Sequence, residues 1–307
     1  MASREAGDEL RCSGEAERVG DAERPLTDGM AGAEHPRISI DEALRNYWFE
    51  IWYQPKIDLK RKCLAGAEAL ARIRHPLLGV LLPGSFLPEG DEHSIAHLTE
   101  HVLTSTLRDW STFDEAGFNL HLAMNVPVSV LLKLPIPALV GEYRPQASHW
   151  PGIILEVSED QIVRDIKLAH EIATELHMNG ISIAIDDFGA GYSSFARLRQ
   201  LPFSEIKLDC SFVANCAVDA TNAAICQTAI DLAHRFRSAA VAEGIEHPAD
   251  LQSLLLMGCD FGQGVLLAPP MPMDDFIALL RRRMQKPPPS QPIEHPADTA
   301  EHADRVA

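Results

Sequence analysis

The fold is decided by the stretch Ile181-Ser-Ile-Ala-Ile-Asp186-Asp187-Phe188-Gly189-Ala-Gly191-Tyr-Ser193-Ser194. An apolar, β-branched run ends here in two adjacent carboxylates and a glycine-rich turn. This pattern predicts a buried strand that delivers charge to the rim of a sheet or barrel. Two neighbouring acids are costly in such a place unless cations compensate them.

The acid pair permits two interpretations. Where a strand ends and the backbone turns, both carboxylates can face one site, with Asp186 bridging two divalent ions and Asp187 binding the second ion or its water. Alternatively, the pair caps the following helix, and Gly189 and Gly191 shape an ordinary turn. The stretch alone does not decide between them.

The composition is that of a globular protein of 307 residues with a formal charge of -17. With no long basic run, this charge argues against a nucleic-acid polymer or an anionic membrane as partner. The N-terminus lacks the apolar segment of a signal peptide, and no uncharged apolar stretch is long enough to span a bilayer. We therefore expect no membrane insertion and a cytoplasmic location.

The cysteines form no C-x-x-C pair and no regular framework, so we expect reduced thiols rather than disulfides or a zinc finger. They are Cys12, Cys63, Cys210, Cys216, Cys226 and Cys259.

The ends of the chain lack sustained apolar periodicity. Residues 1–37 predict a disordered or loosely ordered leader, and residues 285–307, with their prolines and polar residues, predict a disordered tail. One domain is expected between them, over residues 38–284.

This core alternates strand-like runs with longer amphipathic runs, the pattern of a βα repeat. We expect strands at residues 49–57, 64–72, 118–125, 152–156, 181–186, 205–208, 239–243 and 259–262. Helices are expected near 95–110, 128–140, 164–179, 194–200, 219–236, 248–257 and 273–284. The number of expected strands and the length of the core favour an α/β fold of the TIM (β/α)8 type. An open doubly wound sheet would show the same alternation of strands and helices.

Polar residues end several of the predicted strands, and in a parallel barrel such ends meet at one face. They are Asn125, Glu156, Asp186, Lys207, Glu243 and Gln263, while Glu68 lies within a strand of small and apolar residues. These residues also have structural interpretations. Asn125 could cap a helix, and Glu156 or Glu159 could be an acid in the first turn of a helix, where the helix dipole favours it. Lys207 and Asp209 could form an ion pair on the surface, Glu243 and Glu246 could belong to a turn, and Gln263 could be an ordinary amide in a loop. Their occurrence together favours an active site.

Several ordered blocks make the chain resemble the EAL-domain family of cyclic di-GMP phosphodiesterases. The blocks are Tyr53-Gln54-Pro55, Glu68-Ala-Leu70-Ala-Arg72, Met124-Asn125-Val126, Leu155-Glu156-Val-Ser-Glu159, Asp186 to Ser194, Ile206-Lys207-Leu-Asp209, Ala242-Glu243-Gly-Ile-Glu246 and Gly262-Gln263-Gly264. They run from about residue 38 to residue 284 in the family's order.

The resemblance implies a TIM-like barrel whose first strand is antiparallel to the others, and a site with two metal ions that converts cyclic di-GMP to linear 5′-pGpG. By position, the metal ligands would be Glu68, Asn125, Glu156, Asp186 and Asp187. Glu243 would be the general base or the acid that orients the metal-bound water, and Lys207 would hold the attacking water or the phosphate.

The resemblance also assigns residues around the metal site. Those along the substrate would be Gln54, Leu70, Arg72, Asp209, Glu246 and Gln263. Those coupling the site to a homodimer interface would be Glu159, Phe188, Gly189, Gly191, Ser193 and Ser194.

Oxygen-rich ligands without His or Cys select hard ions, so Mg²⁺ or Mn²⁺ is expected, two per site, and Ca²⁺ is expected to inhibit. The chain departs from the family's pattern on the substrate side. Ile73 and Val265 replace aromatic residues that are common there, and the segment 86–93 is altered.

Three functions remain open. The first is a metal-dependent cyclic di-GMP phosphodiesterase, and the second is a noncatalytic EAL module that binds cyclic di-GMP or a partner protein. The third is a TIM-barrel metallohydrolase that acts on another phosphoester.

Overall fold

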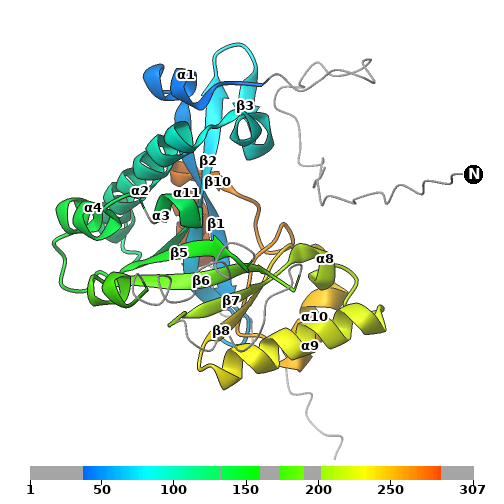
Figure 1. The fold of residues 1–307 in the computed structure, drawn as a ribbon. Helices are drawn as coiled ribbons and strands as arrows, with labels where there is room; N and C mark the ends of the chain where they lie inside the picture. The colour runs from blue at the N-terminus through cyan, green and yellow to red at the C-terminus, as the bar shows by residue number, and fades with distance from the viewer. Residues whose placement is uncertain (1–36, 132, 160–172, 190–201, 285–307) are drawn as a thin grey trace, which may run out of the picture.

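A closed barrel forms the centre of the protein in the computed structural model, which describes residues 37–131, 133–159, 173–189 and 202–284 (Figure 1). Within these residues, eight strands form the ring: β1 (Phe49–Asp58), β2 (Cys63–His75), β4 (His121–Asn125), β5 (Ile153–Ser158), β6 (Ile181–Phe188), β7 (Glu205–Leu208), β8 (Ala239–Ala242) and β9 (Phe261–Gly262). Two short strands, β3 (Gly79–Leu81) and β10 (Met271–Pro272), extend β2 and β1 outside the ring.

The first strand closes the barrel. β1 pairs with both β2 and β9, and both pairings are antiparallel. The ladders from β2 through β4 to β9 are all parallel. The predicted TIM-like barrel with an antiparallel first strand is therefore confirmed, and an open doubly wound sheet is excluded because its edge strands would not pair.

Helices cover the outside of the barrel. They are α1 (Ile40–Arg45), α2 (Glu92–Glu115), α3 (Val128–Leu131), α4 (Ile136–Tyr143), α8 (Cys210–Val213), α9 (Ala220–Arg235), α10 (Pro248–Met257) and α11 (Met273–Met284). In Figure 1, α2 and α4 lie on one side of the ring and α9 and α10 on the other. α2 packs against β1, β2 and β4, and α9 against β7 and β8.

The observed helices differ from the expected ones in places. The helix expected at 128–140 is two helices, because Pro135 lies between them at the start of α4 and cannot donate a helical hydrogen bond. Sequence periodicity did not predict the short elements α1, α8, β3 and β10, or the 3₁₀ turns Pro83–Ser85 and Leu87–Glu89.

Parts of the expected structure lie outside the described residues. These are the leader, the tail and the helix at 194–200, while the helix at 164–179 is described only from 173 onward, with 173–178 helical. Among the described helices, none has both the length and the apolar character needed to cross a lipid bilayer.

Two apolar layers lie on opposite sides of the strands. The main core fills the space between the ring and its helices. A second, small cluster consists of Ala123, Ile154 and Ala184. Each of these residues stands two positions before Asn125, Glu156 or Asp186, so by strand alternation it points to the same side. The barrel interior therefore has an apolar layer below the polar strand ends.

A buried ion pair lies at the other end of the interior, near the amino ends of the parallel strands. Lys56 Nζ donates to both carboxylate oxygens of Glu205, at 2.5 and 2.7 Å. His121 lies beside this pair, and its Nε2 atom is buried without a hydrogen-bond partner among the described residues. Burial and the charge of Lys56 lower the pKa of His121 to about 4, although Glu205 acts in the opposite direction.

We predict that His121 makes the protein less stable in mild acid. The unfolded chain takes up a proton on this histidine near its ordinary pKa of about 6.5, whereas the folded chain does so only near 4. The contribution of neutral His121 to the free energy of unfolding is therefore complete above about pH 6.5 and declines as the pH falls toward 4. Between pH 7.5 and pH 5 the free energy of unfolding should fall by about 2 kcal/mol for this reason.

Urea unfolding of the wild type and of His121→Gln at both pH values tests this. The wild type should lose about 2 kcal/mol more than the variant over this interval, since the other titrating groups are common to both proteins. An identical pH dependence in the two proteins would contradict the assignment.

Candidate active site

A β-bulge brings the two adjacent acids to one site at the end of the barrel, with Asp186 buried and Asp187 exposed. In the ladder between β6 and β7, Ile185 pairs with Ile206 but Phe188 pairs with Leu208, so Asp186 and Asp187 together oppose one residue, Lys207. Asp187 has a positive φ of 55°. A bulge of this kind changes the direction of a side chain that would otherwise alternate to the far side of the strand. The strand thus continues to Phe188 and does not end at the acid pair as expected.

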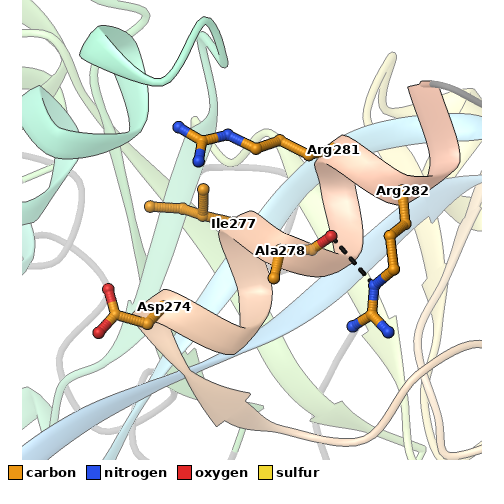
Figure 2. A pocket seen from close by; sticks show the side chains of 5 residues that line it. All are labelled: Asp274, Ile277, Ala278, Arg281 and Arg282. Carbon is orange, nitrogen blue, oxygen red and sulfur yellow. Dashed lines mark hydrogen bonds between the residues drawn. The ribbon is translucent and has the colours of Figure 1, made fainter.

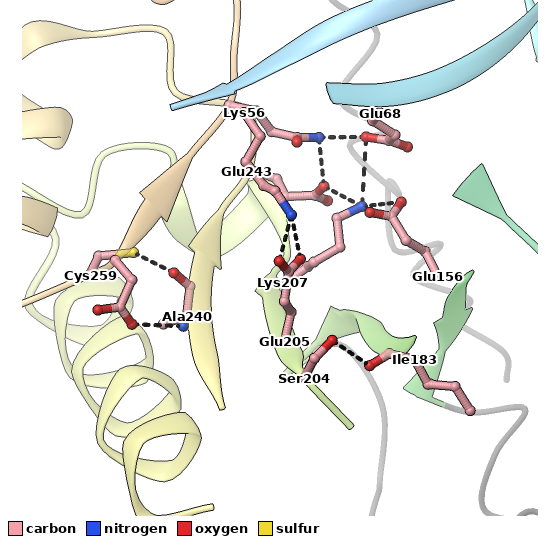
Figure 3. Close-up of polar contacts among 12 residues, drawn as sticks. Lys56, Glu68, Glu156, Ile183, Ser204, Glu205, Lys207, Ala240, Glu243 and Cys259 are labelled. Carbon is pink, nitrogen blue, oxygen red and sulfur yellow. Dashed lines mark hydrogen bonds and ion pairs between the residues drawn. The ribbon is translucent and has the colours of Figure 1, made fainter. Parts of the chain in front are cut away.

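One ammonium group lies at the centre of the site (Figure 3). Figure 3 shows Lys207 with Glu68, Glu156 and Glu243 around it. Lys207 Nζ is 2.7 Å from a carboxylate oxygen of Glu156, 2.7 Å from Glu243, 3.3 Å from Asp186 and 3.7 Å from Glu68. The Lys207 side chain is 1% exposed and that of Glu156 is 2% exposed. Four carboxylates from four strands or strand ends therefore surround a single buried positive charge.

Two amide side chains fix the orientation of Glu68. Asn125 Nδ2 donates to one oxygen of Glu68 at 2.7 Å, and Gln263 Nε2 donates to the other at 2.5 Å. The Gln263 amide also donates to Glu243 at 3.0 Å. The Gln263 amide therefore connects Glu68 with Glu243.

Burial and mutual repulsion control the ionisation of these acids. Burial, and then the charge of Glu68, raises the pKa of Glu156 well above its ordinary value. Burial raises the pKa of Glu243 to about 8, and burial with Asp186 raises that of Asp187 to about 6. The charge of one ammonium group is thus too small to keep all of the surrounding acids ionised.

Two groups in the cluster stay charged. Burial opposes the ionisation of Glu68, but Lys207 and Gln263 hold its pKa below the ordinary value. Burial also opposes the charge of Lys207, but the surrounding carboxylates, with Glu156 first, hold its pKa well above the ordinary value.

The site fits divalent metal ions. Single carboxylate oxygens of Asp186, Asp187 and Glu243 lie within 4.8 Å of one another. All of the predicted ligands are oxygen donors, which suit Mg²⁺, Mn²⁺ or Ca²⁺ rather than zinc. The surplus of buried carboxylates supplies the physical reason for a cation, because only added positive charge lets all of them ionise.

A cavity of about 260 Å³ opens above these acids. Its walls include eight residues predicted to hold metal, substrate or the reacting groups, namely Gln54, Glu68, Leu70, Asp186, Lys207, Glu243, Glu246 and Gln263. Sequence reasoning assigned no role to three further lining residues, Cys210, Gly244 and Gly264, whereas it had placed the fourth, Val265, on the substrate side. The steric need for glycine at position 264 is visible only in the fold, since a Cβ atom there would lie 2.2 Å from the backbone nitrogen of Ile245.

Other predicted substrate residues lie around this cavity rather than in its walls. Arg72 is 8% exposed, and its guanidinium lies 5.9 Å from the ring centre of Trp52. Its Nε atom has no hydrogen-bond partner among the described residues. Asp209 caps α8 by accepting from the backbone of Ser211 at 2.8 Å. The capping hydrogen bond thus explains the position of the Asp209 side chain without a bound ligand.

The two aromatic replacements have different surroundings. Ile73 is fully buried in the main core, so this substitution does not alter the wall of the cavity. Val265 does line the cavity and is 42% exposed.

The residues predicted to couple the site to a dimer interface are described only in part. A carboxylate oxygen of Glu159 accepts from the backbone nitrogen of Gly189 at 3.0 Å, directly after Phe188. Gly191, Ser193 and Ser194 lie outside the described residues. Glu159 therefore contacts the start of this loop, and its role in coupling stays a prediction.

The structure corrects two of the alternative interpretations. Lys207 is not part of a surface pair, because it is among the most buried large side chains of the protein. Asn125 is not a helix cap: α3 begins at Val128, and the Asn125 amide binds Glu68.

A larger hollow of about 540 Å³ lies along α11 (Figure 2). It is lined by Asp274, Ile277, Ala278, Arg281 and Arg282. Its polar groups do not converge: Arg282 Nε donates to the carbonyl of Ala278 in the same helix, at 3.2 Å. The chemistry therefore belongs to the smaller cavity at the strand ends.

Comparison with known proteins agrees with this geometry. The family model described as EAL domain matches residues 38–270. The cyclic di-GMP phosphodiesterase RocR of Pseudomonas aeruginosa is 35% identical over 253 residues, which are 80% of this chain and 63% of that protein. MucR of the same organism, a bifunctional diguanylate cyclase and cyclic di-GMP phosphodiesterase, is 35% identical over 78% of this chain and 35% of its own length.

Solved structures show the same fold. A phosphodiesterase structure of PaMucR in complex with c-di-GMP has a TM-score of 0.71 and 32% identity, covering 77% of this chain and 97% of that one. The EAL enzyme Bd1971, in a form with cAMP and cyclic di-GMP bound, has a TM-score of 0.71 and 28% identity, over 78% and 67%. The chain spans between 35% and 63% of the length of the first curated relatives that it matches.

We predict that Lys207→Met destabilises the metal-free protein by roughly 3–5 kcal/mol, because it leaves buried carboxylates without their ammonium. Mn²⁺ should restore more stability to this variant than it adds to the wild type, since the ion would compensate the same acids. Urea unfolding with chelator and with Mn²⁺ measures both quantities.

Lys56→Met is the matched control. It removes a buried lysine from the pair with Glu205, at the opposite end of the barrel, so its response to Mn²⁺ should equal that of the wild type. An equal gain from Mn²⁺ in all three proteins would contradict the cation role of Lys207.

Proposed function

The chain belongs to the EAL domain family, and from this premise we propose that it is a metal-dependent phosphodiesterase that hydrolyses cyclic di-GMP to linear 5′-pGpG. The observation that carries the proposal is the set of four carboxylates around buried Lys207 at the floor of a cavity. Relatives named as cyclic di-GMP phosphodiesterases support the choice of substrate.

The predicted ligands would hold two divalent ions. Glu68, Asn125, Glu156 and Asp186 would hold the first, and Asp186 with Asp187 the second. The bulge supports this assignment, because it lets two adjacent residues face one site. When bound, the ions would supply a nucleophile at neutral pH and stabilise the negative charge that develops on the phosphoryl oxygens.

Glu243 is the proposed general base. Its carboxylate lines the cavity and is held by Lys207 at 2.7 Å and by the Gln263 amide at 3.0 Å. It would accept a proton from the attacking water while the phosphodiester bond to the leaving oxygen breaks. The pKa of Glu243, about 8 without added cations, falls as positive charge enters the site, which makes the carboxylate available as a base.

Lys207 and Arg72 are the proposed cationic partners of the anionic substrate. Lys207 lines the cavity floor and orients Glu156 and Glu243. Arg72 lies on the same side of β2 as Glu68 and Leu70, by strand alternation. Its planar guanidinium has the geometry to bind a phosphate through two hydrogen bonds.

The second candidate is a noncatalytic EAL module that binds cyclic di-GMP. The presence of every predicted metal ligand and of the predicted base favours catalysis. Chromatographic product analysis after incubation of the purified chain with cyclic di-GMP and Mg²⁺ or Mn²⁺ separates the two. Formation of 5′-pGpG supports the enzyme, and binding without product supports the module.

Finer features rest on the resemblance. We propose a homodimer, a cytoplasmic location, a folded domain at residues 38–284 and no catalytic role for the two ends of the chain. The hydrogen bond between Glu159 and Gly189 supports a link from β5 to the loop after β6.

We predict that Glu243→Gln lowers kcat by about 10²–10⁴-fold and leaves cyclic di-GMP affinity within a few-fold, because the amide cannot accept the proton. Steady-state kinetics and calorimetric binding measure the two effects. Glu142→Gln, on the exposed surface of α4, is the control and should match the wild type. Turnover near the wild-type rate in Glu243→Gln would remove this residue from the mechanism.

We also predict a dependence on the kind of metal ion. Mg²⁺ and Mn²⁺ should support hydrolysis, whereas Ca²⁺ should permit binding with little turnover, because its oxygen ligands lie at about 2.3–2.6 Å rather than about 2.0–2.1 Å. A displacement of about 1 Å in the reacting groups can cost on the order of 10²-fold in rate.

Chelator-treated protein with each ion added back tests this. Asp186→Asn should abolish Mg²⁺-dependent turnover, because it removes charge from the proposed bridge between the ions. Full activity after stringent chelation, or equal rates with Ca²⁺ and Mg²⁺, would argue against a site with two metal ions.

A further inference from the structure

Three histidines repeat along one face of α2, at His93, His97 and His101. The first two are exposed, and their ring centres lie 4.1 Å apart with an angle of 59° between the planes. Residues four positions apart are neighbours on a helix surface. The two imidazoles therefore already lie side by side, without any contribution from another element.

In the part of the chain that the structure describes, His93 and His97 make no side-chain hydrogen bond or ion pair, and their recorded ring contact is with each other. Other histidine rings are engaged in polar contacts: His149 binds Asp114 at 2.7 Å, His234 binds Asp260 at 2.8 Å, and His75 accepts from the backbone of Leu77 at 3.2 Å. The α2 pair thus keeps its ring nitrogens available for a ligand.

The third member of the row has a structural role instead. His101 is partly buried, with its ring centre 6.1 Å from that of Phe49. Burial, and then the charge of Arg108, lowers the pKa of His101. Packing against β1 thus accounts for His101, but no comparable packing accounts for His93 and His97.

Negative charge surrounds the exposed pair. Asp91 caps the helix by accepting from Ser94 at 2.8 Å, and Glu100 follows His97 by one helical turn. The nearby cation is Lys133, which forms an ion pair with Glu92. Because the whole chain carries a formal charge of -17, cations are attracted to this surface rather than repelled.

Two histidines separated by four helical positions have the geometry with which a helix presents two nitrogen ligands to one metal ion. Imidazole favours Zn²⁺, Ni²⁺ and Cu²⁺, whereas the carboxylates in the barrel favour Mg²⁺ and Mn²⁺. We propose that His93 and His97 chelate one divalent transition ion of the imidazole-preferring class on the surface of α2. Water completes its coordination, and the site is chemically separate from the oxygen-rich cavity.

A copper chelate distinguishes this site from the carboxylates. Nitrilotriacetate fills all but two neighbouring positions on Cu²⁺, so tight binding of the complex requires two adjacent imidazoles. The full chain, saturated with Mg²⁺ to occupy the barrel site, is titrated with Cu²⁺–nitrilotriacetate. Electron paramagnetic resonance then reports the bound copper and its nitrogen ligands.

The wild type should bind one complex with two nitrogen ligands from the protein. His93→Gln and His97→Gln should each weaken binding by on the order of 10²-fold, because the second ligand no longer acts within the same helix. His177→Gln, which removes an exposed histidine elsewhere, is the matched control and should bind as the wild type does.

Circular dichroism verifies that each variant is folded. Equal affinity of the wild type and His97→Gln, or a copper spectrum with one nitrogen ligand in the wild type, would overturn the proposal. No readout uses phosphodiesterase activity, so the result is independent of the proposed enzyme function.

Discussion

The site depends on one buried ammonium group, that of Lys207, among four carboxylates. These groups come from β2, β5, β6, β7 and the end of β8, so the cluster exists only when the barrel is closed. Burial makes an unpaired carboxylate costly, and one lysine compensates only part of the charge. Because the metal-free site has too little positive charge for its carboxylates, it is suited to divalent cations.

Backbone geometry determines where this charge is placed. The parallel strands end on one side of the barrel, and the inward positions two residues earlier form the apolar layer of Ala123, Ile154 and Ala184. The bulge in β6 then turns a second acid, Asp187, toward the site. At the opposite end, Glu205 and Lys56 satisfy each other directly. That pair is balanced in charge and needs no further ion, which distinguishes it from the cluster around Lys207.

The two proposed metal sites are thereby separated in space. The barrel offers buried oxygen ligands with a surplus of negative charge, which suit hard ions. The surface of α2 offers two exposed nitrogens that a single helix holds in place. The first site requires the whole tertiary structure, whereas the second requires only two turns of helix and adjacent histidines. Ligand softness would therefore let the two proposed sites take different ions from the same solution.

The sequence by itself determined the alternation of strands and helices, the family and the identities of the polar residues at the strand ends. It could do so because apolar periodicity and ordered motifs are local features of the chain. Periodicity did not show α1, α8, β3 or β10, which are too short to display a repeat.

Only the tertiary structure decided that Lys207 is buried rather than at the surface. It also decided that Asn125 and Gln263 hold Glu68 by hydrogen bonds. The residues that complete the cavity wall became known in the same way: Cys210, Gly244, Gly264 and Val265. The tertiary structure also decided the partnership of Lys56 with Glu205, which are 149 positions apart. The physical reason is that burial, pKa and charge balance depend on neighbours brought together by closure of the barrel, and local patterns carry no information about them.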